Sequence, residues 1–335
     1  MQEAIAIDLG TANTLIIHND KVVVDQPSIV AKNIRTGEVV AIGKRAQQMH
    51  GKTHKEIETL RPLKDGVIAD FQASEQMIRG FIKMIDSGKR FLPVSHRMVI
   101  CIPSGITEVE KRAVRDSAEH AGAKEVYMIH EPLAAAIGIG INIERPVGSM
   151  IVDIGGGTTE IAIIALSGIV TDQSIRVAGD SFTDDILDYM KRQHNLLIGE
   201  RSAEKIKIEV GSAMTELKDA PEDLDIRGRD LVSGIPKVVK ITYSEIAFAM
   251  DKSISKIEEA VLKALENSPP ELSADIYDNG IYLTGGGALL RGLDKRLNLK
   301  TKLPIHVAEE PLRAVVRGTG IALKNIDGFR AVLMS

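Results

Sequence analysis

The amino-acid sequence predicts an α/β fold in which one structural unit occurs twice. Two distant segments share a pattern: an apolar strand that ends in Asp, a glycine two residues later, and then a second strand. Along the rest of the chain, strand patterns alternate with helical patterns, which is typical of α/β proteins. The chain has 335 residues, more than one ordinary core requires, so two domains are expected.

The first of these segments lies near the N-terminus. Residues 4–8 form an apolar run that ends at Asp8, and residues 15–17 form a second apolar run. Gly10 lies two residues after Asp8, and Thr14 lies four residues after that glycine. This pattern predicts a strand, a tight turn and a second strand.

The second segment repeats the pattern in the middle of the chain. Residues 151–153 form a short apolar run that ends at Asp153, and residues 160–165 form the following strand. Gly155 and Thr159 keep the spacing that Gly10 and Thr14 have in the first segment. Because only two copies occur, the pattern favours two related domains over a solenoid.

Two helices are predicted from capping motifs at their first residues. Thr107 with Glu110, and Thr242 with Glu245, have capping-box spacing. In this motif the hydroxyl and the carboxylate each satisfy a free backbone N–H at the helix start. We therefore expect one helix after Thr107 and a long amphipathic helix after Thr242.

Three further helix starts are predicted from apolar spacing and from glycine positions. Helices are expected to begin at Ser181 and at Ser202. Residues 281–284 read as a buried strand, which runs into the glycines at 285–287 and then into a helix that begins at Ala288. These elements complete the alternation of strands and helices.

Composition excludes several classes of protein. The net charge of −4 provides no overall basic field, and the chain has no Trp, so nucleic acid is not an expected partner. Cys101 is the single cysteine and lies in an apolar run, which predicts a buried strand thiol in a reducing compartment. No apolar stretch reaches the roughly 18 residues of a membrane span, and no secretory signal is present.

Glycine-rich turns after strands are suited to binding phosphate. Without a Cβ, backbone N–H groups can approach phosphate oxygens, and an Asp at the strand end can hold Mg²⁺ through water. Such turns occur at Gly10, at 155–157 and at 285–287. The sequence has no Walker A motif, no dinucleotide fingerprint, no nucleophile elbow and no zinc-ligand spacing, so a different nucleotide fold is indicated.

These motifs resemble those of the actin, Hsp70 and sugar-kinase superfamily. Residues 8–11 and 153–158 resemble its two phosphate motifs, residues 283–288 its adenosine motif, and residues 131–136 and 317–320 its two connecting helices. Within the superfamily the chain resembles the MreB family of bacterial actin homologues. That narrower resemblance is carried by residues 7–14, 61–71, 199–207 and 227–232.

The resemblance implies an actin-like ATPase fold, with duplicated ribonuclease-H-like domains around a central nucleotide cleft. The first domain would span residues 1–143, with subdomain IB at roughly 30–75. The second would span residues 144–316, with subdomain IIB at roughly 178–245. Residues 317–335 would form a C-terminal helix that returns to the first domain.

The resemblance also implies a site for ATP and Mg²⁺. Residues expected to bind the nucleotide are Asp8, Gly10, Thr11, Ala12, Asn13, Gly155, Gly156, Gly157, Thr158, Glu204, Lys205, Ile206, Lys207, Gly285, Gly286, Gly287 and Ala288. Asp8 and Asp153 would hold Mg²⁺ through water. Glu131 and Thr158 would position the attacking water, with Asp153 as the third catalytic residue.

Two of these assignments also have ordinary structural interpretations. Glu204 and Lys207 have the spacing of a solvated ion pair on a helix. Glu131 precedes Pro132, and a carboxylate is common in a first helical turn. His130 stands where relatives usually carry a second acid, which bears on the local charge and on the rate of hydrolysis.

The function implied by the resemblance is that of a weak ATPase of the bacterial cytoskeleton. Such a protein polymerises with itself into paired protofilaments and directs cell-wall synthesis to maintain rod shape. It is cytoplasmic and peripheral at the inner face of the cell membrane, and its partners include the elongation proteins RodZ and MreC. Because three residues precede the first strand, we expect no N-terminal amphipathic helix, and Phe91 and Leu92 become the candidate membrane loop.

Three alternatives remain open from the sequence. A sugar kinase of the same superfamily would need a general-base Asp beside a sugar pocket. An Hsp70-like ATPase would need a substrate-binding domain after the nucleotide domain. A scaffold that binds ATP without turnover would not need Glu131 and Thr158.

Overall fold

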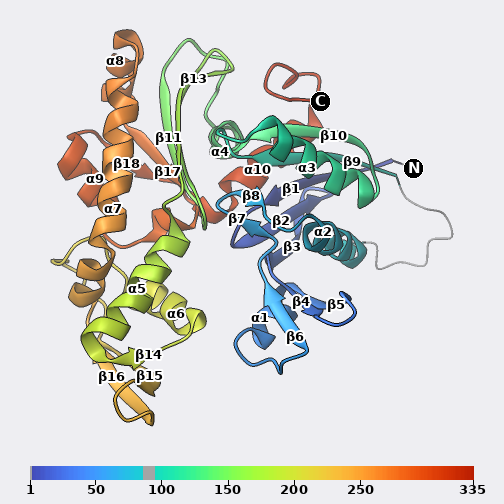
Figure 1. The fold of residues 1–335 in the computed structure, drawn as a ribbon. Helices are drawn as coiled ribbons and strands as arrows, with labels where there is room; N and C mark the ends of the chain where they lie inside the picture. Colours follow the sequence, from blue (N-terminus) through green and yellow to red (C-terminus); the bar gives the residue numbers. More distant parts are fainter. Residues whose placement is uncertain (1, 86–94) are drawn as a thin grey trace.

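The computed structural model describes residues 2–85 and 95–335. Its chain forms two lobes, each built around a five-stranded sheet, and helices α4 (Glu131–Gly138) and α10 (Ala314–Lys324) lie between them (Figure 1). Each lobe also carries a smaller β-sheet at one end. The expected α/β class is therefore confirmed.

The two large sheets have the same strand order and sense. The first runs β3-β2-β1-β9-β10 and the second β13-β12-β11-β17-β18. In each, the first three strands are antiparallel neighbours and the last two add in parallel. The strands are β1 (Gln2–Leu9), β2 (Asn13–His18), β3 (Lys21–Pro27), β9 (Ser95–Ile102), β10 (Ala123–His130), β11 (Ser149–Ile154), β12 (Thr159–Ala165), β13 (Gly168–Ile175), β17 (Ile281–Thr284) and β18 (Ile305–Val307). This shared topology confirms the duplication predicted from the two hairpins.

Each lobe has a smaller sheet, inserted between the third and fourth strands of its large sheet in chain order. In the first lobe β5-β4-β6 form a three-stranded sheet, and β7 and β8 form a short ribbon. In the second lobe β14-β15-β16 form the small sheet. These strands are β4 (Val30–Asn33), β5 (Val39–Ile42), β6 (Ile57–Leu60), β7 (Leu63–Lys64), β8 (Val67–Ile68), β14 (Leu196–Leu197), β15 (Leu224–Asp230) and β16 (Pro236–Ile241).

The remaining helices cover the sheets. α2 and α3 pack on the first large sheet, α7, α8 and α9 pack on the second, and α1, α5 and α6 accompany the small sheets. Their bounds are α1 (Gly43–Met49), α2 (Phe71–Ile85), α3 (Glu108–His120), α5 (Gly179–His194), α6 (Glu200–Val210), α7 (Tyr243–Glu266), α8 (Pro270–Asn279) and α9 (Leu293–Thr301). Two 3₁₀ turns span Gly286–Leu289 and Pro311–Arg313.

Strand β9 of the first large sheet is buried on both faces. On β9, Met98 and Ile100 pack into the core of the first lobe, while Val99 and Cys101 pack into a separate core with α4 and α10. Because side chains alternate along a strand, one strand supplies both cores. The predicted burial of the Cys101 thiol is confirmed.

The two connecting helices α4 and α10 cross at glycines. A Cβ on Gly138 would overlap the carbonyl oxygen of Ala314, and a Cβ on Gly318 would overlap that of Ala134. Only glycine permits this close approach of two helix backbones. The crossing lies in a core that strands of both lobes share, and it is formed by the segments that the sequence motifs predicted as connecting helices.

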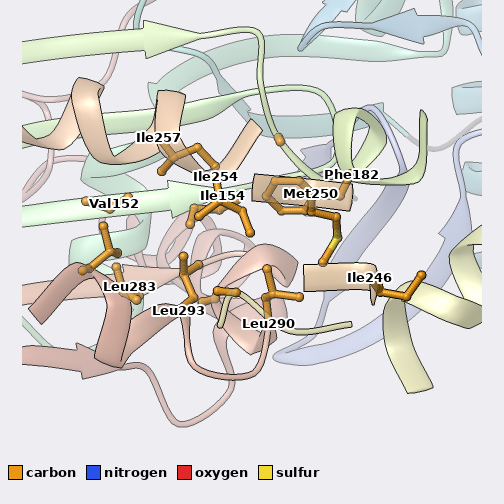
Figure 2. Packing of buried hydrophobic residues seen from close by; sticks show 14 of the residues in the cluster. Val152, Ile154, Phe182, Ile246, Met250, Ile254, Ile257, Leu283, Leu290 and Leu293 are labelled. Atoms are coloured by element: carbon orange, nitrogen blue, oxygen red, sulfur yellow. The ribbon is translucent and has the colours of Figure 1, made fainter. Parts of the chain in front are cut away.

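The largest core lies in the second lobe. Figure 2 shows Val152 and Ile154 of β11, Phe182 of α5, and Met250 and Ile254 of α7 packed together. All five are essentially inaccessible to solvent, and burial of each such side chain contributes about 1.5–3 kcal/mol. This core holds the strand that carries Asp153 in a fixed position.

Helix starts test the local predictions. Both capping boxes are present, at Thr107 before α3 and at Thr242 before α7. Helices α5 and α6 begin at Gly179 and Glu200, each two residues before the predicted starts at Ser181 and Ser202. Helix α5 begins earlier because of a tertiary contact. The N–H of Gly179 donates to the carbonyl of Gly155, which fixes the first helical turn at Gly179.

The helix expected from Ala288 is wrong. The glycine run forms the 3₁₀ turn Gly286–Leu289, and the following α-helix begins only at Leu293. The chain is held there because a Cβ on Gly287 would overlap the side chain of Ile154, and because the N–H of Gly285 donates to the carbonyl of Pro311. Contact with the second hairpin therefore overrides local helix formation.

In the described parts of the chain, none of the helices combines the length and apolarity needed to cross a bilayer.

Candidate functional site: the cleft between the two hairpins

The two predicted phosphate hairpins face one another across the lobes. A Cβ on Gly156 would lie 2.6 Å from the Cβ of Ala12, and one on Gly157 would lie 2.7 Å from Oγ1 of Thr11. Any larger side chain at these glycines would push the hairpins apart. The structure therefore brings residues 10–13 and 155–158 together, although about 145 residues separate them in the chain.

A third turn closes over both hairpins. The N–H of Gly66 donates to Oγ1 of Thr11 at 2.9 Å, and Thr158 packs against the same glycine. A Cβ on Gly157 would lie 3.0 Å from Cα of Asp65. Sequence reasoning gave this turn no role in the site, although Asp-Gly between β7 and β8 is a recognised hairpin signal.

Asp8 and Asp153, at the strand ends, are buried beside the two hairpins without a basic partner in the described parts of the chain. Burial raises the pKa of Asp8 to about 6, while a hydrogen bond from Sγ of Cys101 at 3.2 Å opposes the rise. Burial raises the pKa of Asp153 to about 7, against a hydrogen bond from Oγ1 of Thr284 at 2.7 Å. Within residues 2–85 and 95–335, neither carboxylate forms an ion pair with Lys or Arg. Each is therefore suited to a bound cation.

Glu131 joins the same carboxylate group from the first turn of α4. Burial raises its pKa well above the usual range, and the nearby charges of Glu160, Asp153 and Asp8 raise it further. Asp8, Asp153 and Glu160 are therefore near enough for their charges to act on Glu131. The Glu131 carboxyl therefore holds a proton more strongly than a solvated carboxylate at a helix start does.

Glu160 was missed by sequence reasoning. It is fully buried on β12 and accepts hydrogen bonds from the N–H and Oγ of Ser104 at 3.1 and 2.6 Å, and from Oγ of Ser174 at 2.6 Å. Ser104 belongs to the first lobe and Ser174 to the second, so this carboxylate joins the lobes behind the hairpins. The sequence feature that could have identified it is that Glu160 is the single acid in the apolar run of β12.

His130 directly precedes Glu131 and is neutral in this setting. Burial lowers the pKa of His130, and its Nδ1 lies 3.3 Å from the carbonyl oxygen of Pro103. A neutral imidazole that donates to a carbonyl adds no positive charge to the carboxylate group. His130 therefore contributes neither a positive nor a negative charge to the carboxylate group.

Residues of α6 reach the cleft beside the start of α5. Nζ of Lys207 donates to the carbonyl of Gly179 at 2.8 Å and to Oγ1 of Thr183 at 3.1 Å, and it pairs with Glu204 at 2.6 Å. These contacts hold the Glu204–Lys207 pair in place, whereas the spacing of the two residues alone suggested an ion pair exposed to solvent. The other two residues predicted here lie elsewhere: Ile206 is in the core, and Lys205 is exposed beside Glu209.

The third glycine run contacts the second hairpin directly. Gly285 and Gly287 both press against Ile154, whereas Ala288 is buried in the core of the second lobe. The structure thus brings residues 285–287 next to residues 155–158, as a shared nucleotide site requires. Ala288 itself supports the turn through packing.

Charged residues near the start of α5 and α6 bridge the lobes. Arg61 of the first lobe lies 2.9 Å from Asp180 and 3.6 Å from Glu200 of the second, and His50 lies 3.4 Å from Glu200. These side chains are about 35 to 50% exposed, so each contact contributes little to stability. Sequence reasoning did not find these contacts, because they join segments more than 100 residues apart.

Metal ligands in the described parts of the chain are few. No group of three or more His, Cys, Asp or Glu there is arranged to hold a metal ion. An ion between Asp8 and Asp153 would therefore need phosphate oxygens and water to complete its coordination, which is the usual arrangement for Mg²⁺. Phe91 and Leu92, the predicted membrane loop, lie outside the described residues.

With this geometry in view, similarity to known proteins is extensive. The family model described as MreB/Mbl protein matches residues 2–331. The chain belongs to the MreB/Mbl family. Cell shape-determining protein Mbl of Bacillus subtilis (strain 168) is 48% identical over 324 residues, 96% of each chain. Cell shape-determining protein MreB of Escherichia coli (strain K12) is 48% identical over 328 residues, 96% of this chain and 94% of that one.

Solved structures agree with the MreB/Mbl assignment. MreB 5 of Spiroplasma citri bound to AMPPNP matches with a TM-score of 0.91 at 41% identity, over 98% of both chains. A MamK double helical filament matches in fold, with a TM-score of 0.80 at 20% identity, over 98% of this chain and 99% of that one. The resemblance read from the motifs is confirmed, and the fold is actin-like.

Proposed function

We propose that this MreB/Mbl protein is a weak ATPase that forms membrane-associated filaments and directs cell-wall synthesis to maintain rod shape. ATP would bind with its phosphates between the hairpins at residues 10–13 and 155–158. The observation that carries this proposal is the contact of two glycine hairpins beside four carboxylates that have no basic partner among the described residues. Backbone amides for phosphate and carboxylates for a cation are the two requirements of a Mg–nucleotide site.

Hydrolysis would depend on positioning more than on a strong base. A bound Mg²⁺ neutralises phosphate charge as it develops in the transition state. Asp8 and Asp153 are the residues that would hold it through water. Thr158, whose side chain lies beside the turn at Gly66, and Glu131 would orient the attacking water. The raised pKa of Glu131 favours proton acceptance from that water.

The remaining contacts would fix the nucleoside. Glu204 and Lys207 of α6 and the glycines at 285–287 would surround ribose and adenine, with the anchored Glu204–Lys207 pair as the polar element and with Ile206 and Ala288 supporting them from the core. We propose the division expected from sequence for the whole chain: residues 1–143, 144–316 and 317–335. Residues 30–75 and 178–245 would contain subdomains IB and IIB.

Relatives support the nucleotide-binding, filament and cell-shape parts of this proposal. MreB 5 of Spiroplasma citri was crystallised with AMPPNP and with ADP, and MamK forms a double helical filament. The curated relatives are named cell shape-determining proteins. We extend to this chain nucleotide binding, paired protofilaments, a place at the inner face of the cell membrane, and RodZ and MreC as partners.

ATP-dependent pelleting tests the proposal. The wild-type protein should sediment with ATP and Mg²⁺ and stay in the supernatant without nucleotide. Glu131→Ala should still bind ATP but release phosphate at least about tenfold more slowly, because the water loses its orienting carboxylate. Glu144→Ala, at an exposed position, is the matched control. Undiminished turnover in Glu131→Ala would contradict the assigned role.

Flotation with liposomes tests the membrane part separately. Polymer of the wild type should float with vesicles, and a Phe91→Ser, Leu92→Ser variant should float less. Each chain offers little apolar area, so binding should require polymer, in which many weak sites act together. Equal flotation of both proteins would remove Phe91 and Leu92 from the proposal.

A further inference from the structure

Glu160 lies directly across the second hairpin from Asp153. The two residues are cross-strand partners of β11 and β12, so their side chains project from the same face of the sheet. Glu160 is fully buried, and its charge acts on Glu131 of the first lobe. It is not among the residues expected to touch nucleotide, Mg²⁺ or the attacking water. A carboxylate that is buried so completely is rare unless donors engage its oxygens.

Hydrogen bonds from both lobes reach the Glu160 carboxylate. Its Oε2 accepts from the N–H of Ser104 at 3.1 Å and from Oγ of Ser104 at 2.6 Å. Its Oε1 accepts from Oγ of Ser174 at 2.6 Å. Ser174 is the partner of Glu160 on the neighbouring strand β13, so that bond stays within the second lobe. Each lobe therefore holds one oxygen of the same carboxylate.

Ser104 belongs to a short loop that lies against the second lobe. The loop follows β9 and leads to Thr107, the cap of α3. A Cβ on Gly105 would lie 3.2 Å from Cβ of Ser174, so the loop and β13 are in close contact. We call residues 103–105 the bridging loop. Its place on the second lobe is fixed by this contact and by the two hydrogen bonds to Glu160.

The bridging loop also contacts the residue before Glu131. Strands β9 and β10 end side by side, with Ile102 opposite His130. Nδ1 of His130 lies 3.3 Å from the carbonyl oxygen of Pro103. Because β10 ends at His130 and α4 begins at Glu131, a shift of Pro103 would be passed to the first turn of α4.

On another side, Pro103 faces the turn that closes over the hairpins. A Cβ on Gly66 would lie 2.9 Å from Cγ of Pro103 and 3.1 Å from Cγ2 of Thr158. The bridging loop is thus linked to both residues expected to orient the attacking water. It reaches Glu131 through His130. It reaches Thr158 through Gly66.

We propose that Glu160 is a positioning residue for ATP hydrolysis, which holds Glu131 and Thr158 at their working separation through the bridging loop. Glu131 follows a strand of the first lobe and Thr158 belongs to the second, so the gap between them widens if the lobes part. The hydrogen bonds from Ser104 to Glu160 oppose that movement. A misplacement of about 1 Å can reduce a rate by about a hundredfold. The inference rests on the proposed ATPase function.

Loss of the Ser104 hydroxyl is the first test. Ser104→Ala removes one donor and keeps the backbone N–H, so the protein should fold. Phosphate release at saturating ATP should slow about tenfold, while KM for ATP should stay within about twofold, because the hairpins still bind the phosphates. Ser104→Thr keeps the hydroxyl and should restore the rate to within about threefold of wild type. A KM that rises as much as the rate falls would indicate lost binding and overturn the proposal.

Ser174→Ala is the matched control. It removes a hydroxyl at the same 2.6 Å distance from the same carboxylate, but within one lobe. Its rate of phosphate release should stay within about twofold of wild type. Equal slowing by Ser104→Ala and Ser174→Ala would mean that Glu160 supports only local structure, which would contradict the positioning role.

Glu160→Gln distinguishes hydrogen bonding from charge. The carbonyl of the Gln side chain can accept from both donors of Ser104, and its NH₂ group can donate to Oγ of Ser174. The rate should therefore stay within about fivefold of wild type, whereas Glu160→Met, which accepts no such bond, should lose about a hundredfold. An equal loss in the Gln and Met variants would assign the effect to charge and overturn the proposal.

The outcomes separate this inference from the proposed function. Wild-type protein that hydrolyses ATP, together with a Ser104→Ala variant that hydrolyses it equally fast, would overturn the positioning role and leave the ATPase function standing. Wild-type protein without ATP turnover would overturn both.

Discussion

In the first lobe β1 and β2 carry Asp8 to the cleft, and in the second lobe β11 and β12 carry Asp153 to the facing position. Both aspartates end a buried strand, and both precede a glycine turn that must lie close to the other lobe. The two hairpins therefore share one backbone arrangement. Their carboxylates differ in the donors that support them.

Asp8 receives a hydrogen bond from the thiol of Cys101, and Asp153 receives one from the hydroxyl of Thr284. A hydroxyl is the stronger donor, so hydrogen bonding alone would give Asp153 the lower pKa. Both pKa values are raised instead, to about 6 for Asp8 and about 7 for Asp153, with burial as the largest cause at both and with the charges of Asp8 and Glu160 adding at Asp153. Burial and like charge, more than local donors, decide how strongly each hairpin needs a cation.

Separating the hairpins should have the largest effect. Gly156→Val places a side chain where the Cβ of Ala12 already lies, so the lobes must part and phosphate contacts are lost from both sides. Affinity for Mg–ATP should fall about a thousandfold, or about 4 kcal/mol, in equilibrium titration. Ala12→Gly, which empties the same contact from the other hairpin, should bind within about threefold of wild type. Near-normal affinity of Gly156→Val would mean that the hairpins do not act together.

Neutralising each aspartate should stabilise the nucleotide-free protein. Both folded-state pKa values lie above the 3.8 of an unfolded Asp, so the folded chain retains protons that the unfolded chain has lost. The free energy of unfolding contributed by these groups therefore falls as pH rises from 3.8 to about 7 and stays low above that.

Asp8→Asn should accordingly gain stability over wild type across this window, by about 3 kcal/mol at pH 8, and Asp153→Asn should gain more. Urea unfolding in EDTA at pH 5 and pH 8 measures the difference. Asp223→Asn, at an exposed carboxylate, should show no such trend. If the gain in the free energy of unfolding were the same at both pH values, ionisation of the aspartates would not be its cause.

Removing the supporting donors should have the smallest effect and should differ between hairpins. Thr284→Val removes a hydroxyl from the buried Asp153 carboxylate and should weaken Mg–ADP binding about tenfold at pH 7. Cys101→Ala removes only a weak thiol donor from Asp8 and should change binding by less than about threefold. Calorimetric titration of both variants decides, and equal losses would show that the two donors are equivalent.

Local patterns predicted the parts of the fold that local chemistry determines. The capping boxes at Thr107 and Thr242 begin helices because their hydrogen bonds close within four residues. The Asp–Gly–Thr spacing revealed the duplication because a tight turn after a strand fixes residue types at fixed intervals. The start of α5 at Gly179 was not predictable, since its first turn depends on carbonyl groups of the second hairpin.

The site was predicted where motifs carry it and missed where distant segments meet. Asp8, Glu131 and Asp153 followed from the family resemblance, and the structure brings them together. Glu160 and Arg61 were not found, because their roles appear only when Ser104 or Asp180 approaches from the other lobe. Side chains that join lobes leave no periodic signal in sequence.

The central claim is that the two hairpins form one nucleotide site. Hydrogen–deuterium exchange with and without Mg–AMPPNP tests it on the intact protein, at a concentration below pelleting. Amides at residues 9–14 and at residues 154–159 should both exchange at least about tenfold more slowly when the nucleotide is bound, because both sets of N–H groups face the phosphates. Protection confined to one hairpin, or absent from both, would contradict the account.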